Sequence, residues 1–163
     1  MREHVVDDAA KRESRNDESF GSRISFSLHT SPFTLCSMLA HFTLATRDVP
    51  NTSRFFQETL GWKQVRMPAN IDLEADWLEV GPGLQVHILG IPGFEPSPFE
   101  LEFGRHFAVF YSGREFTALK QRLTEHGADL IPAIRATPFE RFFFRDPNGY
   151  MWEVIDRDHF IAE

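Results

Sequence analysis

The chain has 163 residues, a formal net charge of −7 and a single cysteine, Cys36. It is long enough to bury a core, it has no apolar run of about 18 or more residues that would span a membrane, and its negative charge without a Lys/Arg cluster argues against nucleic acid as a partner. One cysteine excludes an intramolecular disulfide and a cysteine-based metal site, so a cytoplasmic location is expected.

Residues 1–37 are polar and charge-mixed and lack sustained periodicity, which predicts a disordered N-terminal extension. Its many acidic residues fit neither a secretory signal nor a transit peptide. We expect one folded domain over residues 38–163. One hypothesis is that the first 37 residues are an upstream extension of the true reading frame, which resistance of this segment to limited proteolysis would contradict.

The first half of the domain reads as one strand, one helix and a hairpin. The helix pattern has Asn51 or Thr52 as a candidate N-cap and Gly61 as its C-terminal stop. A turn rich in glycine at residues 81–83 separates the two hairpin strands. The expected elements are a strand over 39–46, a helix over 49–62 and strands over 76–81 and 84–90.

The second half repeats this order after a linker. Residues 91–104 contain three prolines and show no periodicity, so they are expected to connect the halves. Phe116, Leu119 and Leu123 recur at helical spacing. The stretch Asp146 to Gly149 predicts a tight turn. The expected elements are a strand over 105–111, a helix over 115–127 and strands over 140–146 and 149–156.

The repeat can be checked by spacing. His41 opens the first strand of one half, and His106 opens that of the other. His87 follows His41 by 46 residues, and Glu153 follows His106 by 47. His87 and Glu153 each lie four positions after a hairpin glycine. The two opening histidines are therefore expected at equivalent positions, and so are the two later residues.

These four residues are of metal-ligating type. If the halves pack about a pseudo-twofold axis, the side chains of His41, His87, His106 and Glu153 are expected to converge on one point. Imidazole nitrogens with one carboxylate suit Zn, Fe, Ni, Co or Mn, with a coordination position left for substrate. The alternative is that each histidine is an ordinary core or surface residue and that Glu153 lies on a solvated sheet face.

Candidates for the wall of a substrate pocket are Thr43, Trp77 and Phe144, with simple packing as the alternative for each. Small residues share the expected ligand face of the two opening strands, which leaves room beside the histidines. No G-x-S-x-G motif, phosphate-binding glycine loop or cysteine nucleophile is present to support acyl or phosphoryl transfer by the usual routes.

The stretches HFTLATRDVPNTSRFFQETLGW, RHFAVFY and FFFRDPNGYMWEVID resemble the vicinal oxygen chelate superfamily, which contains glyoxalase I, fosfomycin-resistance transferases, extradiol dioxygenases and bleomycin-binding proteins. The resemblance implies an α+β fold of two βαβββ modules whose cupped mixed sheets surround a divalent metal ion. The modules would span residues 39–90 and 105–157, with the linker 91–104 between them. In most metal-binding members the ligands occupy positions that match His41, His106 and Glu153.

The resemblance implies a metal-dependent glyoxalase-like lyase or isomerase for a small substrate with vicinal oxygens, with Glu153 as metal ligand and base. His87 departs from glyoxalase I, which usually has a carboxylate at that position. Two alternatives stay open, an Fe(II) ring-cleaving dioxygenase of the extradiol type and a binding protein for a small molecule or antibiotic that performs no chemistry. A homodimer is expected, with the site within one chain or shared by two. The metal, the substrate and any thiol cofactor are undetermined.

Overall fold

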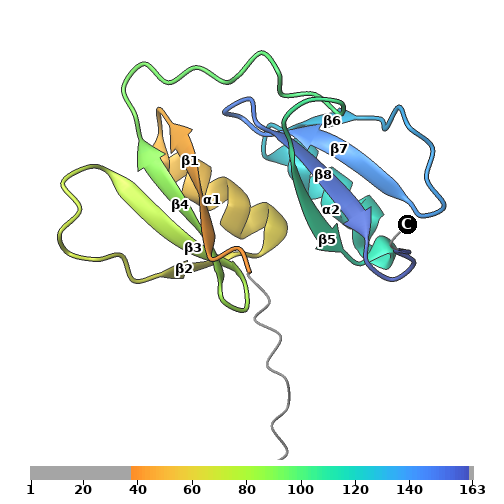
Figure 1. Ribbon diagram of the computed structural model, residues 1–163, viewed down its shortest axis with the longest axis horizontal. Coiled ribbons are helices and arrows are strands. Elements are labelled where there is room, and N and C mark those ends of the chain that lie inside the picture. The colour runs from red at the N-terminus through yellow and green to blue at the C-terminus, as the bar shows by residue number, and fades with distance from the viewer. Residues whose placement is uncertain (1–37, 162–163) are drawn as a thin grey trace, which may run out of the picture. The chain divides into compact units, whose positions relative to one another are not determined.

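Two modules of the order β-α-β-β-β make up the part of the chain that the structure, a computed structural model, describes, residues 38–161 (Figure 1). The prediction for residues 1–37 lies outside this part. The first module consists of β1 (His41–Thr46), α1 (Val49–Leu60), β2 (Lys63–Val65), β3 (Ala75–Gly81) and β4 (Leu84–Gly90). The second consists of β5 (Phe107–Tyr111), the short 3-10 helix η1 (Gly113–Glu115), α2 (Phe116–Glu125), β6 (Asp129–Ile131), β7 (Arg141–Arg145) and β8 (Met151–Asp156).

Each module forms a mixed four-stranded sheet, with strand orders β1-β4-β3-β2 and β5-β8-β7-β6. The first strand of each module pairs in parallel with the last, and the other neighbours are antiparallel. The α+β class and the paired βαβββ modules expected from the sequence are therefore confirmed.

The strand registers of the two modules are equivalent residue by residue. His87 pairs with Thr43 on one side and Trp77 on the other. Glu153 pairs with Ala108 on one side and Phe143 on the other. Partners in register point to the same face of a sheet, so each row places its central residue on the same face of its own module.

The start of α1 differs from the sequence expectation. Its N-cap is Asp48, which has an extended backbone and accepts a hydrogen bond from the Asn51 N–H at 3.0 Å. The candidates Asn51 and Thr52 were wrong because Pro50 is tolerated in the first turn, so the helix begins before them. At its end, Gly61 adopts φ 75°, as its predicted role as a stop requires.

Two strands escaped the sequence patterns. Strands β2 and β6 have three residues each, too few to show an alternating pattern, and only the family resemblance implied them. Residues 91–104, between the two modules, contain no helix or strand. Among the described residues, no helix is long and apolar enough to cross a membrane.

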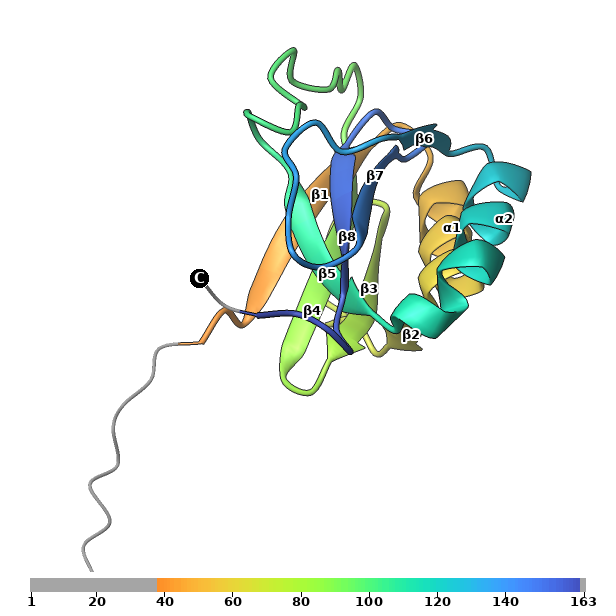
Figure 2. The same ribbon diagram turned by 90° about the vertical axis from the view of Figure 1, so that its right-hand side faces the viewer.

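The modules pack through aromatic side chains, with both helices on one side of the sheets (Figure 2). Phe42 of β1 lies 4.8 Å from Phe107 of β5 and 6.1 Å from Trp152 of β8, measured between ring centroids. The helices are joined where His126 Nε2 lies 2.9 Å from Glu58 Oε2. This arrangement buries the face of each sheet that the helices cover, and no helix of the described part of the chain covers the opposite faces.

The turn between β7 and β8 fastens the second module to the first. Asn148 Oδ1 accepts a hydrogen bond from Thr46 Oγ1 at 2.7 Å, and the Tyr150 hydroxyl accepts one from the Ala45 N–H at 2.9 Å. Gly149 has φ 94°, and a Cβ there would lie 2.8 Å from a side-chain carbon of Pro96. Glycine is therefore required at this position both for its conformation and for space.

Candidate functional site

On the open face of the first sheet, three rings form a stack. The ring of His87 lies between that of Trp77, 3.6 Å away, and that of His41, 4.2 Å away. Burial and the neighbouring His41 lower the pKa of His87, which favours its neutral form. The indole N–H of Trp77 is buried and has no hydrogen-bond partner within residues 38–161. This stack offers ring nitrogens together with an unused donor.

On the open face of the second sheet, Glu153 lies between two basic side chains. Its Oε2 is 3.5 Å from His106 Nε2, and its Oε1 accepts a hydrogen bond from Arg141 at 2.6 Å. The carboxylate between Met151 and Ile155 is therefore neither solvated nor unpaired, since the Glu153 side chain is only 10% exposed. One oxygen is held by Arg141, and the other faces the imidazole.

Arg141 joins this pair to the linker. It also donates to Glu102 Oε1 at 2.5 Å, and Glu102 accepts backbone N–H bonds from Ile134 and Arg135. Burial acts to raise the pKa of Glu102, but these hydrogen bonds outweigh it and hold the pKa below its usual value. Burial likewise opposes the charge of Arg141, yet its two carboxylate partners raise its pKa. Both groups are thus charged at neutral pH.

The four predicted donors are brought together as two pairs, His41 with His87 and His106 with Glu153. Within residues 38–161, no three His, Cys, Asp or Glu side chains are grouped closely enough to hold a metal ion. The donor types do fit a first-row divalent ion, since three imidazoles and one carboxylate are ligands that such ions accept. A common site for all four stays a prediction.

The three predicted wall residues have different surroundings. Thr43 and Trp77 flank His87 in the same cross-strand row. Phe144 instead lies in the core, 6.2 Å from Trp152 and 6.3 Å from Phe55 between ring centroids. The ring beside the donors is that of Phe143, which pairs with Glu153 and lies 5.4 Å from His106. The signal that could have identified Phe143 as the neighbour of Glu153 is the hairpin register, because the five residues between β7 and β8 set which residues pair.

Sequence patterns did not find Arg141 or Glu102 as neighbours of the site. Neither has a counterpart in the spacing that linked the histidines, because Glu102 belongs to the irregular linker and reaches Arg141 from 39 positions away. The available signal was strand alternation, which puts Arg141 on the same face of β7 as Phe143, where a charge requires a partner once it is buried.

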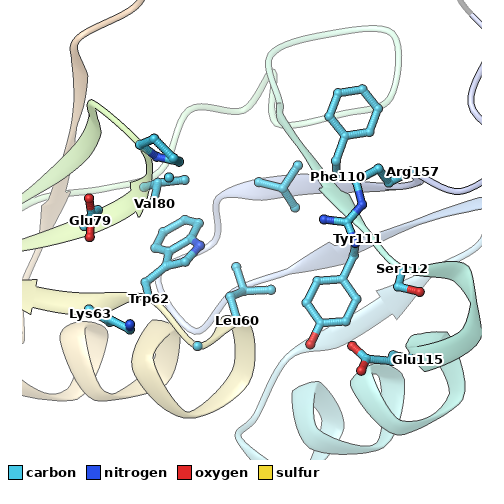
Figure 3. Close-up of a pocket in the computed structure, with 14 residues that line it drawn as sticks. Leu60, Trp62, Lys63, Glu79, Val80, Phe110, Tyr111, Ser112, Glu115 and Arg157 are labelled. Atoms are coloured by element: carbon cyan, nitrogen blue, oxygen red, sulfur yellow. The ribbon is translucent and has the colours of Figure 1, made fainter.

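A cleft of about 420 Å³ opens elsewhere, at the boundary between the modules (Figure 3). Leu60, Trp62 and Val80 of the first module face it from one side, and Tyr111 and other residues of the second module face it from the other. None of the four predicted donors lines this cleft. It is therefore separate from the two donor pairs.

Comparison with known proteins places this geometry in a family. The model of the Glyoxalase/Bleomycin resistance protein/Dioxygenase superfamily matches residues 38–154. The chain is 27% identical over 124 residues to Glyoxylase I 4 of Arabidopsis thaliana, a match that covers 74% of this chain and 71% of that protein.

Solved structures share the fold. The fosfomycin resistance protein FosX from Mesorhizobium loti aligns with a TM-score of 0.60 and 18% identity, over 75% of this chain and 93% of that one. A putative glyoxalase family protein from Bacillus anthracis gives a TM-score of 0.60 and 21% identity, over 74% and 94%. A FosX variant from Listeria monocytogenes, complexed with Mn(II) and 1S,2S-dihydroxypropylphosphonic acid, gives 0.62 and 17%, over 74% and 92%. With the family model matching most of its length, the chain belongs to the Glyoxalase/Bleomycin resistance protein/Dioxygenase superfamily.

Proposed function

We propose that the protein is a metal-dependent enzyme of the glyoxalase type, a lyase or isomerase acting on a small molecule with two adjacent oxygens. The observation that carries this proposal is the equivalence of the two cross-strand rows: His87 and Glu153 occupy the same place in their modules, and each lies beside a histidine, His41 or His106. Unrelated positions for His87 and Glu153 would not be expected to share register in this way.

The proposed ligands are His41, His87, His106 and Glu153. His87 enters as a neutral imidazole because its pKa is lowered, and Glu153 has Oε2 free of any hydrogen bond to arginine. A divalent ion held by these groups would supply Lewis-acid stabilisation of negative charge that develops on the substrate oxygens.

Glu153 is the proposed base as well as a ligand. Arg141 holds Oε1 in place, so Oε2 would have to loosen from the ion, or act from its edge, to take a proton from a substrate C–H group. On the other module, the proposed donor to a substrate oxygen is the Trp77 indole N–H, which has no acceptor among the described residues. Thr43 completes the wall on that side.

The substrate class is supported by the relatives. The Listeria FosX variant is complexed with Mn(II) and a dihydroxypropylphosphonic acid, whose two hydroxyls stand on adjacent carbons. The Arabidopsis relative carries a glyoxylase I name. Both relatives fit a site that binds vicinal oxygens. The sequence identity of the chain to FosX is too low for the two to be assigned the same substrate on that ground.

We further propose that two copies of the chain share each site, as a homodimer in the cytoplasm. The helices of both modules lie on one side, so the open faces carry their donor pairs on two separate sheets (Figure 2). A twofold axis would set the first module of one copy against the second module of the other, which adds the missing donors to each pair.

Replacing Glu153 tests the proposed chemistry. Because Glu153→Gln keeps the shape but removes the charge and the base, we expect turnover of hemithioacetals of 2-oxoaldehydes by metal-loaded protein to fall at least about 100-fold. Glu125→Gln, at an exposed position on α2 and so on the helix side of the sheets, is the matched control and should retain activity. Full activity of the Glu153 variant would refute the assignment.

One rival has a specific observation in its favour. His41, His106 and Glu153 are also the two-histidine, one-carboxylate set of Fe(II) oxygenases. Oxygen uptake with catechols by protein loaded anaerobically with iron would favour a ring-cleaving dioxygenase over a lyase. Protein that binds no metal after reloading would instead favour a binding protein.

A further inference from the structure

An apolar pocket of about 390 Å³ lies at the second module, between the linker and the loop after β6. Six apolar side chains form most of its lining, and these residues define the apolar pocket: Leu101, Phe103, Ile131, Pro132, Ile134 and Met151. Its volume is within the range of about 300–1,000 Å³ that is usual for small-molecule sites.

The apolar pocket lies on the same face of the second sheet as the His106–Glu153 pair, although neither of these two residues lines it. Met151 precedes Glu153 by two residues on β8, so both side chains point to the same face. Ile131 pairs with Phe143, which pairs with Glu153, so all three belong to one cross-strand row. A ligand atom at the donor pair would therefore have the apolar pocket beside it along the same sheet.

The two charged residues that border the apolar pocket are already bonded. Arg145 donates to the carbonyl oxygens of Gly149 at 2.9 Å and Glu100 at 3.0 Å. The carboxylate of Glu102 accepts from two backbone N–H groups and from Arg141. The chemistry of the pocket therefore suits a group that makes no hydrogen bonds.

The exposure of the side chains that line the apolar pocket indicates that a ligand binds there. Phe103 is 73% exposed, Ile134 76% and Leu101 52%, and these side chains lie together at the pocket. A cluster of large apolar side chains left in water marks a binding site more often than chance exposure does. An apolar ligand that fills the pocket would remove this surface from water.

We propose that the apolar pocket binds the alkyl or aryl substituent of the substrate, whose two adjacent oxygens face the His106–Glu153 pair. This inference rests on the proposed function and specifies its substrate class: compounds with vicinal oxygens that carry a hydrophobic side chain are favoured over small, fully polar ones. The linker and the loop after β6 thus set specificity, whereas the sheet carries the chemistry.

Alkyl hydroxamates of increasing length test this proposal. Their two adjacent oxygens mimic the proposed substrate oxygens, and their chain length can be varied from acetohydroxamate to octanohydroxamate. With Mn(II)-loaded full-length protein, isothermal titration should show the affinity rising by up to about fourfold per methylene until the pocket is filled. Phe103→Ser and Ile134→Ser should flatten this dependence and leave acetohydroxamate affinity unchanged.

Phe99→Ser is the matched control, since Phe99 is 68% exposed on the same linker but does not line the apolar pocket. The same length dependence in all three variants, or none in the unaltered protein, would overturn the proposal. Dissociation of a dimer by Phe103→Ser or Ile134→Ser would also overturn it, because the patch would then be an interface.

Failure of the proposed function gives a different result. In that case acetohydroxamate does not bind the metal-loaded protein at all. Binding in the apolar pocket is then measured separately, by methyl NMR spectra recorded with 1-hexanol as the ligand. Shifts of the Met151 and Ile134 methyl signals that Phe103→Ser weakens would still support the pocket. Unchanged spectra would overturn it.

Discussion

The position of Glu153 on its strand follows from the sequence, but its ion pair with Arg141 does not. The sequence placed it by repeat phase on the same face as Met151 and Ile155, and the structure confirms this phase. Its partnership with Arg141 was not predictable in this way, because Arg141 is positioned by the β7–β8 register and by a carboxylate of the linker. Periodicity identifies which face a residue occupies, whereas ion pairs across the chain depend on tertiary packing.

Asp146, at the β7–β8 turn, is a buried acid with an unusual titration. Its carboxylate accepts hydrogen bonds from the N–H groups of Asn148 and Tyr150 and from the Trp152 indole. Burial nevertheless outweighs these bonds and raises its pKa from 3.8 to about 6. The folded state therefore holds a proton that the unfolded chain releases at lower pH.

This titration predicts a pH-dependent stability. A raised folded-state pKa stabilises the protein fully below the unfolded value, and that contribution is lost as the pH rises through about 6. The difference in unfolding free energy between the unaltered protein and Asp146→Asn should fall between about pH 4 and 7, by at most about 3 kcal/mol. Urea denaturation at several pH values measures it. A difference independent of pH would contradict the raised pKa.

At the scale of elements, long periodic segments were predictable and short or locally capped features were not. The helices and the longer strands follow from hydrophobic spacing, and Gly61 ends α1 as expected. The three-residue strands β2 and β6 carry no pattern of their own and exist because a neighbouring strand pairs with them. The prediction put the start of α1 too late, because a proline such as Pro50 can lie either within the first turn of a helix or just before the helix.

The corrected cap leads to a stability prediction. Asp48→Ala removes the acceptor for the Asn51 N–H and should lower the unfolding free energy by about 1 kcal/mol. Asp48→Asn retains a side-chain oxygen and should cost much less. Asn51→Ala changes a residue that the sequence suggested as the N-cap, and its effect on the unfolding free energy is compared with that of Asp48→Ala. Chemical denaturation that shows a larger loss for Asn51→Ala than for Asp48→Ala would refute the assignment.

At the scale of the molecule, the sequence predicted two equivalent modules but not how they pack. Aromatic contacts of Phe42 with Phe107 and Trp152 join the modules on the helix side, opposite the faces that carry the donor pairs. The spacing between equivalent residues of the repeat contains no information about how the two modules pack, because that depends on side-chain contacts between them. The expected convergence of all four donors therefore requires a second copy in our account.

Metal content of mixed variants tests whether His41 and Glu153 hold the same ion across two copies. We expect about one ion per chain in the unaltered protein and almost none in His41→Ala or Glu153→Gln alone. Unfolding and refolding an equal mixture of the two variants should restore about a quarter of an ion per chain, because half of the dimers then contain one intact site. Variants that each keep a full complement of metal, or a mixture that regains none, would contradict the account.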